Sequence, residues 1–160
     1  MQAWQHCKIW MMMVLSLTIM GCQQQVDIEA ERRELLNVHE TDRRAHFATD
    51  VDLLLSHGTG EFITVAAGRI DTTNRAHLRE HFSRYFDRAT YYAWDDLNPP
   101  IIRISKDGTL AWMITRVHVR RVQRDSTGTG QEREFVYAGI MTYEKLDGKW
   151  LRTANVSTFE

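Results

Sequence analysis

Cysteine and proline are scarce in this sequence, and neither sign of charge dominates it. Its 160 residues include two Cys and two Pro, and 20 Lys and Arg stand against 21 Asp and Glu, for a formal net charge of -1. Two Cys cannot build a disulfide framework or a four-thiolate zinc site. The balanced charge argues against a nucleic-acid partner, because tight binding to phosphates needs clustered excess cations. With 43% apolar and 26% charged residues, the composition indicates one globular domain.

Long hydrophobic runs are also lacking, apart from one near the amino terminus. Residues 9–20 are almost uninterrupted in their apolar character; Lys8 precedes them and Gly21 and Cys22 follow. The run is too short to cross a bilayer as a helix, which needs about 20 apolar residues. A positive start, a short apolar run and a small residue are typical of a secretory signal.

The end of this run, Ile19-Met20-Gly21-Cys22, resembles the lipobox of bacterial lipoproteins. The resemblance implies that residues 1–21 are a signal peptide, that Cys22 is lipidated, and that residues 22–27 tether a domain to a membrane of the bacterial cell envelope. Gln23 resembles the second residue of lipoproteins that reach the outer membrane, if the host is Gram-negative. The alternative is an ordinary signal peptide with a chance Cys.

Helix patterns come first in the remaining chain, which predicts an α+β domain rather than a parallel βαβ sheet. Apolar residues spaced along residues 27–48 predict one long amphipathic helix. Thr49 is expected to cap a short helix that passes through residues 53–55 and that Gly58 closes. Residues 61–67 are rich in β-formers, and Thr73 is expected to cap a third helix over residues 74–86.

Strand patterns follow from residue 90 to the end. The break at Asn98-Pro99-Pro100, the polar loop 124–131 and the turn at Asp147-Gly148 divide this part of the sequence. We therefore expect an antiparallel meander. Its strands are expected at residues 90–97, 101–105, 110–123, 135–145 and 149–158.

This order is similar to that of the nuclear transport factor 2-like superfamily, and four segments resemble its SnoaL-like bacterial members. These segments are Phe62-Ile63-Thr64-Val65 before Gly68, the Thr73-capped helix, and residues 105–112 and 143–150. The resemblance implies that residues 28–160 form a cone-shaped barrel, in which a long helix, two shorter helices and a strongly curved antiparallel sheet enclose a cavity. Members include ketosteroid isomerases, dehydratases, polyketide cyclases and transport adaptors, so the fold does not specify a chemistry.

The most suggestive polar residues lie on the first helix. His39, Asp42 and His46 continue the helix face that Leu35 begins, because their spacing is three and four residues. They could form a hydrogen-bonded row facing the cavity, in which Asp42 raises the pKa of either imidazole. In the alternative, the two histidines are partly exposed or bonded to the third helix. The spacing does not resemble that of a zincin, so no metal or other cofactor is expected.

Strand position adds Trp94, Tyr137 and Asn155 to the expected cavity wall. Asp96 shares a face with Trp94 and could act as an acid or base there, or could simply belong to the strand end. His77 and His81 are expected to be solvated or at the rim. The cavity-wall residues by this reasoning are His39, Asp42, His46, Trp94, Tyr137 and Asn155.

Alternation along residues 110–123 separates two faces of one strand. Ala111, Met113, Thr115, Val117 and Val119 form the expected inner face, and Trp112 and Ile114 lie among cations on the other. Because both faces of residues 135–143 are also apolar, we expect a second copy to cover the outer face of the sheet in a homodimer.

These features predict a membrane-anchored domain that binds a small apolar molecule, with no assignable catalysis. No base carboxylate and acid pair of the ketosteroid isomerase type can be aligned. The alternatives are a cofactor-independent isomerase, dehydratase or hydrolase of that type, and an accessory protein-interaction lipoprotein. A buried Asp or His with a strongly shifted pKa would favour the enzyme, an apolar cavity without one would favour binding, and a filled cone would favour the accessory role.

Overall fold

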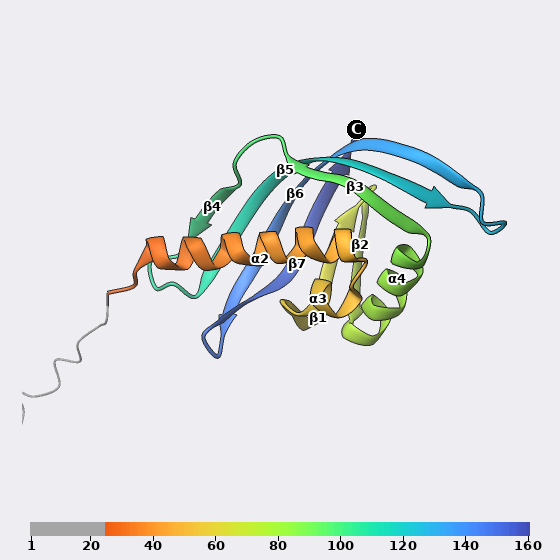
Figure 1. Cartoon of the computed structure of the whole chain (residues 1–160). Coiled ribbons are helices and arrows are strands. Elements are labelled where there is room, and N and C mark those ends of the chain that lie inside the picture. Colours follow the sequence, from red (N-terminus) through yellow and green to blue (C-terminus); the bar gives the residue numbers. More distant parts are fainter. Residues whose placement is uncertain (1–24) are drawn as a thin grey trace, which may run out of the picture.

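Three helices and a seven-stranded sheet make up residues 25–160, the part of the chain that the computed structural model describes (Figure 1). The expected signal peptide at residues 1–21 and the expected lipidation site Cys22 lie outside the described residues, as does the start of the tether. Within residues 25–160, no helix combines the length and the hydropathy that crossing a bilayer requires.

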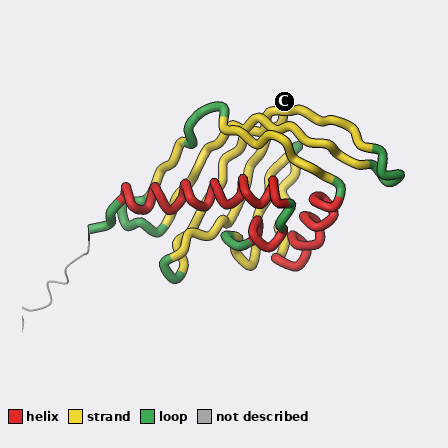
Figure 2. Tube along the Cα trace, in the orientation of Figure 1, coloured by secondary structure: helices red, strands yellow, loops and turns green. Residues whose placement is uncertain are grey.

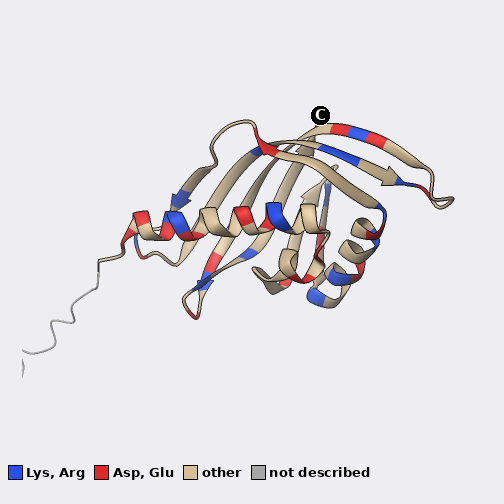
Figure 3. Ribbon diagram, viewed as in Figure 1, with Lys and Arg blue, Asp and Glu red and all other residues tan. Residues whose placement is uncertain are grey.

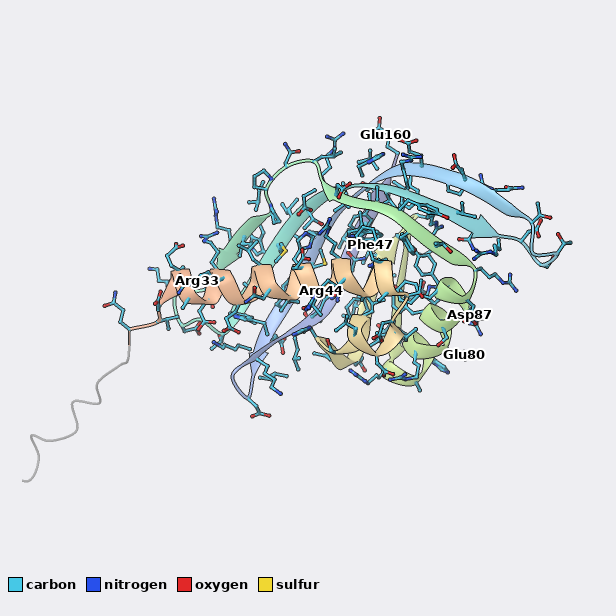
Figure 4. All side chains as sticks on the ribbon, viewed as in Figure 1. Arg33, Arg44, Phe47, Glu80, Asp87 and Glu160 are labelled. Atoms are coloured by element: carbon cyan, nitrogen blue, oxygen red, sulfur yellow. The ribbon has the colours of Figure 1, made fainter. Side chains whose placement is uncertain are left out.

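The long helix α2 runs from Ile28 to Ala48, which confirms the long helix expected there. The carboxylate of Asp27 accepts hydrogen bonds from the backbone N–H groups of Glu29 and Ala30 and so satisfies donors of the first turn. Arg33 and Arg44 lie on the exposed face (Figure 4). The opposite face is buried and consists of Leu35, Val38, His39, Thr41, Asp42, Ala45 and His46.

Two helix caps differ by one residue from the prediction. Thr49 ends α2 in the left-handed conformation, with φ 50°, and Asp50 caps the short helix α3, Val51–Leu55. Asn74 rather than Thr73 caps α4, Arg75–Asp87. In both cases the acceptor is a carboxylate or amide oxygen that reaches the third amide of the helix, 2.9 Å away at Asp50 and 3.0 Å away at Asn74.

A strand that the sequence pattern did not predict follows β1. β1 spans Gly58–Ala66 and pairs antiparallel with β2, Arg69–Asn74. The connecting Ala67 and Gly68 both have positive φ, as a tight two-residue hairpin turn requires. β2 is polar and mostly exposed, so the pairing with β1 rather than its own composition makes it a strand.

The remaining strands complete one curved sheet behind the helices (Figure 2). The order is β2-β1-β7-β6-β5-β3, with β4 also paired to β5. The predicted antiparallel meander is confirmed for β5, β6 and β7, whereas β1 joins β7 in parallel. Since β2 and β3 do not pair within residues 25–160, the cone is open. The bounds are β3 Ala89–Asp96, β4 Ile101–Ile104, β5 Leu110–Arg124, β6 Gly130–Leu146 and β7 Lys149–Phe159.

Two groups of buried side chains pack between α2 and the concave side of the sheet. The first joins Leu35 and Val38 of α2 to Tyr143 and Trp150, among others. The second lies near α3 and α4, around Phe86. The five residues expected on the inner face of β5 are all buried, which confirms the alternation: Ala111, Met113, Thr115, Val117 and Val119.

Candidate functional site

A cavity of about 320 Å³ opens between α2, α4 and the concave side of the sheet. This volume lies in the range of small-molecule sites, roughly 300–1,000 Å³. Its wall is mainly apolar and aromatic. The structure brings together in this wall all six residues that the sequence analysis put there: His39, Asp42, His46, Trp94, Tyr137 and Asn155.

Asp42 is paired with Arg152, a residue of β7 that the sequence analysis missed. The Nη2 of Arg152 donates to Oδ1 of Asp42 over 2.7 Å, and both side chains are largely buried. Burial raises the pKa of the Asp42 carboxyl, and the Arg152 guanidinium opposes this shift. Arg152 keeps its own charge at any physiological pH. The two side chains therefore form a buried ion pair in the cavity wall.

His46 is a neutral imidazole enclosed by aromatic rings. Its Nδ1 donates to the backbone carbonyl of Asp42 over 2.7 Å, and its ring stacks on Trp94 with the ring centroids 3.6 Å apart. Burial lowers the pKa of His46 to about 4, and the positive charges of Arg152 and Arg121 contribute to this shift to a smaller extent. The hydrogen bond to the Asp42 carbonyl acts in the opposite direction and raises the pKa. Asp42 thus raises the pKa of His46 as expected, but through its backbone carbonyl rather than its carboxylate, and burial outweighs this effect, so that the net shift is downward.

His39 bonds to the sheet rather than along the helix. Its Nε2 lies 2.9 and 3.0 Å from the two carboxylate oxygens of Asp96, at the end of β3. The predicted hydrogen-bonded row along α2 is therefore absent: the side chains of His39 and Asp42 bond to strands, and His46 bonds to a backbone carbonyl. Residues one helical turn apart have Cβ atoms about 5–6 Å apart. A side chain of the facing sheet can therefore lie closer to His39 or Asp42 than their neighbours on the helix do.

The sheet places the other three predicted residues opposite α2. The hydroxyl of Tyr137 donates to Oδ1 of Asn155 over 3.0 Å, and burial raises the pKa of Tyr137. The Trp94 and Tyr137 rings lie 6.5 Å apart at 30°. Gly139 leaves room for this arrangement, since a Cβ there would meet the Tyr137 hydroxyl and come within 2.9 Å of the Val156 carbonyl oxygen.

Among the other lining residues, Thr115 lies on the inner face predicted for its strand and His81 was expected at the rim, whereas Arg152 was not predicted. Arg152 could have been found, because it shares a strand face with the buried Trp150, and a lone cation on such a face needs a partner. Thr115 lines the cavity with a buried hydroxyl that has no hydrogen-bond partner among the described residues. His81 is exposed and also lines the cavity, and His77 is exposed outside it. Within residues 25–160, no three His, Cys, Asp or Glu side chains gather closely enough to hold a metal ion.

Comparison with known proteins gives structural likeness only. No protein-family model and no curated protein matches the chain. A ketosteroid isomerase-like protein from Erwinia carotovora atroseptica SCRI1043 is 12% identical with a TM-score of 0.62, over 79% of this chain and 94% of that chain.

Two further solved structures have the same architecture. A candidate dehydratase of the nuclear transport factor 2-like family from Streptomyces avermitilis is 8% identical with a TM-score of 0.58, over 81% of this chain and 95% of that chain. The association domain of C. elegans CaMKII is 15% identical with a TM-score of 0.55, over 81% of this chain and 96% of that chain. These likenesses confirm the predicted fold: the chain forms an open α+β cone similar to those of nuclear transport factor 2-like and cystatin-like structures.

Proposed function

We propose that this protein binds a small, mostly apolar molecule in the cavity between α2 and the sheet. The observation that carries this proposal is the wall itself, in which aromatic side chains such as Phe82, Tyr85 and Trp94 accompany buried polar groups. Apolar walls with few, well-placed polar groups are typical of small-molecule sites. The accessory-protein alternative called for a cone filled by side chains, and the cavity gives it no such support.

The cavity can be tested by filling it. Ser157 lines the cavity, whereas its neighbour Thr158 is exposed on the opposite face of β7. We expect the neutral fluorescent probe N-phenyl-1-naphthylamine to bind saturably to the wild type and to the Thr158→Trp variant. Its affinity for the Ser157→Trp variant should be at least tenfold lower than for the wild type. Equal affinity in the two variants would contradict binding in the cavity.

Acid–base catalysis is the second candidate function. It is favoured by His39, whose imidazole is held by the carboxylate of Asp96 in the wall of an apolar cavity. A histidine oriented by a carboxylate is suited to move protons. The buried His46, with its strongly lowered pKa, is also a sign that the enzyme hypothesis called for. The wild type is expected to isomerise a Δ5-3-ketosteroid. His39→Gln should abolish this activity, and His77→Gln should leave it unchanged. No isomerisation by the wild type would contradict this candidate function.

We further propose that the chain is lipidated at Cys22 and anchored to a membrane of the bacterial envelope, on the periplasmic side of the outer membrane in a Gram-negative host. The apolar run at residues 9–20 and the Gly21-Cys22 pair support this. Labelled palmitate should enter the wild type, which should fractionate with membranes, and Cys22→Ser should lose both the label and the cleavage. Unlabelled, secreted wild-type protein would contradict the proposal.

The outer face of the sheet supports a homodimer. One row of aliphatic residues crosses six strands at matching register positions: Ile101, Ile114, Ile140, Val156, Val65 and Ile70. Beside it, Trp112 lines a groove of about 470 Å³. Monomeric proteins rarely expose a contiguous apolar patch of this kind, and two-fold dimers are the commonest oligomers.

A further inference from the structure

The charges of Asp42 and Arg152 in the cavity wall balance each other. Arg152 contributes a positive charge and Asp42 a negative one, and their side chains are in direct contact. Asp96, which bonds to the His39 imidazole, does not itself line the cavity. A charged ligand group would have to leave water here without an unpaired opposite charge to meet it, which is strongly unfavourable.

His46 and Arg152 leave one hydrogen-bond acceptor and several donors free for a ligand. The Nδ1–H of His46 is used by the Asp42 carbonyl, so Nε2 carries the lone pair and can only accept a hydrogen bond. Arg152 uses only Nη2, and its Nε and Nη1 have no acceptor within residues 25–160. None of these nitrogen atoms of His46 and Arg152 is both fully buried and without a hydrogen-bond partner. The cavity therefore offers both an acceptor and donors.

Aromatic rings define the space beside these groups. Trp94 stacks on His46 and also lies near Tyr137, and Tyr85 meets His46 edge-on. Flat faces of this kind favour offset or edge contacts with another ring. These rings line the same cavity as His46 and Arg152.

We propose that the cavity selects an uncharged ligand with a planar ring and a head group that both donates and accepts hydrogen bonds, such as a primary amide or a hydroxy ketone. The head group donates to Nε2 of His46 and accepts from Arg152. This inference rests on the proposed binding function and adds the ligand class to it.

Four naphthalenes of similar shape and different charge test the inference by calorimetric titration of the purified full chain at pH 7.5. They are 2-naphthamide, 2-methylnaphthalene, the anion 2-naphthoate and the cation 2-naphthylmethylammonium. We expect the amide to bind at least tenfold more tightly than either ion, with 2-methylnaphthalene between them. An ion that binds as tightly as the amide would overturn the head-group inference and leave the binding function intact. Failure of both uncharged compounds to bind would overturn the binding function itself.

One matched pair of variants locates the head group. His46→Phe keeps an aromatic ring beside Trp94 and removes the acceptor, and should weaken 2-naphthamide at least tenfold while changing 2-methylnaphthalene less than twofold. Retained binding of 2-methylnaphthalene also shows that this variant is folded. His77→Phe, at an exposed position outside the cavity, should change neither. Unaltered amide binding by His46→Phe would contradict the assignment, and the wild-type series decides the charge preference even if that variant does not fold.

Discussion

Burial among aromatic rings determines the ionisation of His46. Its ring is stacked on Trp94 and meets Phe86 and Tyr91 edge-on, at centroid distances of 5.5 and 5.2 Å. These neighbours replace water, and a cation there would lose its hydration. The imidazole is thus kept neutral and its tautomer is set by the Asp42 carbonyl, so one residue supplies both an acceptor and a pH-dependent contribution to stability.

The pH dependence has a definite sign. His46 has a pKa of about 4 in the folded chain and 6.5 as an ordinary value, so the unfolded chain binds an extra proton between these values. Its contribution to the free energy of unfolding, roughly 3 kcal/mol, is fully present above pH 6.5 and is lost as the pH falls to 4. We expect His46→Phe to lose less stability than the wild type over this interval in urea titrations. Parallel losses in the wild type and His46→Phe would contradict the buried, neutral state.

The stability contributions of Asp42 and Arg152 should depend on each other, because the two side chains form an ion pair in the cavity wall. Arg152→Met leaves the Asp42 carboxylate buried without its partner and should lower the free energy of unfolding by about 3–5 kcal/mol. Because the pKa of Asp42, already raised by burial, rises further in this variant, the loss should be larger at pH 7.5 than at pH 5. Adding Asp42→Asn should recover part of it. A double variant as unstable as Arg152→Met alone would exclude the pair as the cause.

At the scale of elements, polar contacts tie α2 to the sheet at both ends. Near its start, Glu31 accepts from the indole N–H of Trp150 over 2.8 Å. Near its end, Nε of Arg43 donates to the Trp94 carbonyl over 2.9 Å. The two contacts join α2 to β7 and β3, on either side of β5 and β6 in the sheet. These contacts fix α2 so that His39, Asp42 and His46 on its buried face line the cavity.

Gly139 on β6 has no space for a side chain between the Tyr137 hydroxyl and the Val156 carbonyl of β7. Gly139→Ala should push the Tyr137 phenol away from Asn155, because the new Cβ has no free space. We expect a loss of about 1–3 kcal/mol in stability and weaker binding of N-phenyl-1-naphthylamine. Glu144→Ala, at an exposed position of the same strand, should change neither quantity in denaturation and fluorescence titrations. Wild-type probe affinity in Gly139→Ala would show that Tyr137 does not shape the cavity.

At the scale of the molecule, charge and apolar surface are distributed differently. In Figure 3, residues of both signs alternate along α2 and near the far end of the β5 and β6 hairpin. The outer face of the sheet exposes a row of aliphatic side chains, among them Ile70 at 74% and Ile101 at 51%, next to the cations Arg116 and Arg120 of β5. Such a row is suited to apolar association.

The proposed dimer makes a prediction for this face. Wild-type protein should have twice the chain mass in light scattering, and Trp112→Glu should be monomeric with an unchanged circular dichroism spectrum, because a carboxylate cannot be buried without a partner. Lys106→Glu, at an exposed turn, should remain dimeric. A monomeric wild type would rule out the interface.

Local periodicity alone determined much of this protein. Because a helix turns every 3.6 residues, His39, Asp42 and His46 follow Leu35 on the buried face. Because strand residues alternate, the inner face of β5 was predictable residue by residue. These patterns, with the family resemblance, predicted the α+β cone and the six residues that line the cavity. Lipidation at Cys22, the ligand and the dimer stay predictions.

Only the tertiary structure decided which residues meet. Asp42 faces Arg152, which lies on β7 and is far away in sequence, and His39 faces Asp96 on β3. β2 is a strand because β1 pairs with it, and β1 lies parallel to β7. Sequence periodicity reports which face a side chain occupies, but hydrogen-bond partners and pKa values depend on distances between elements and on burial, which arise only when helices and sheet pack together.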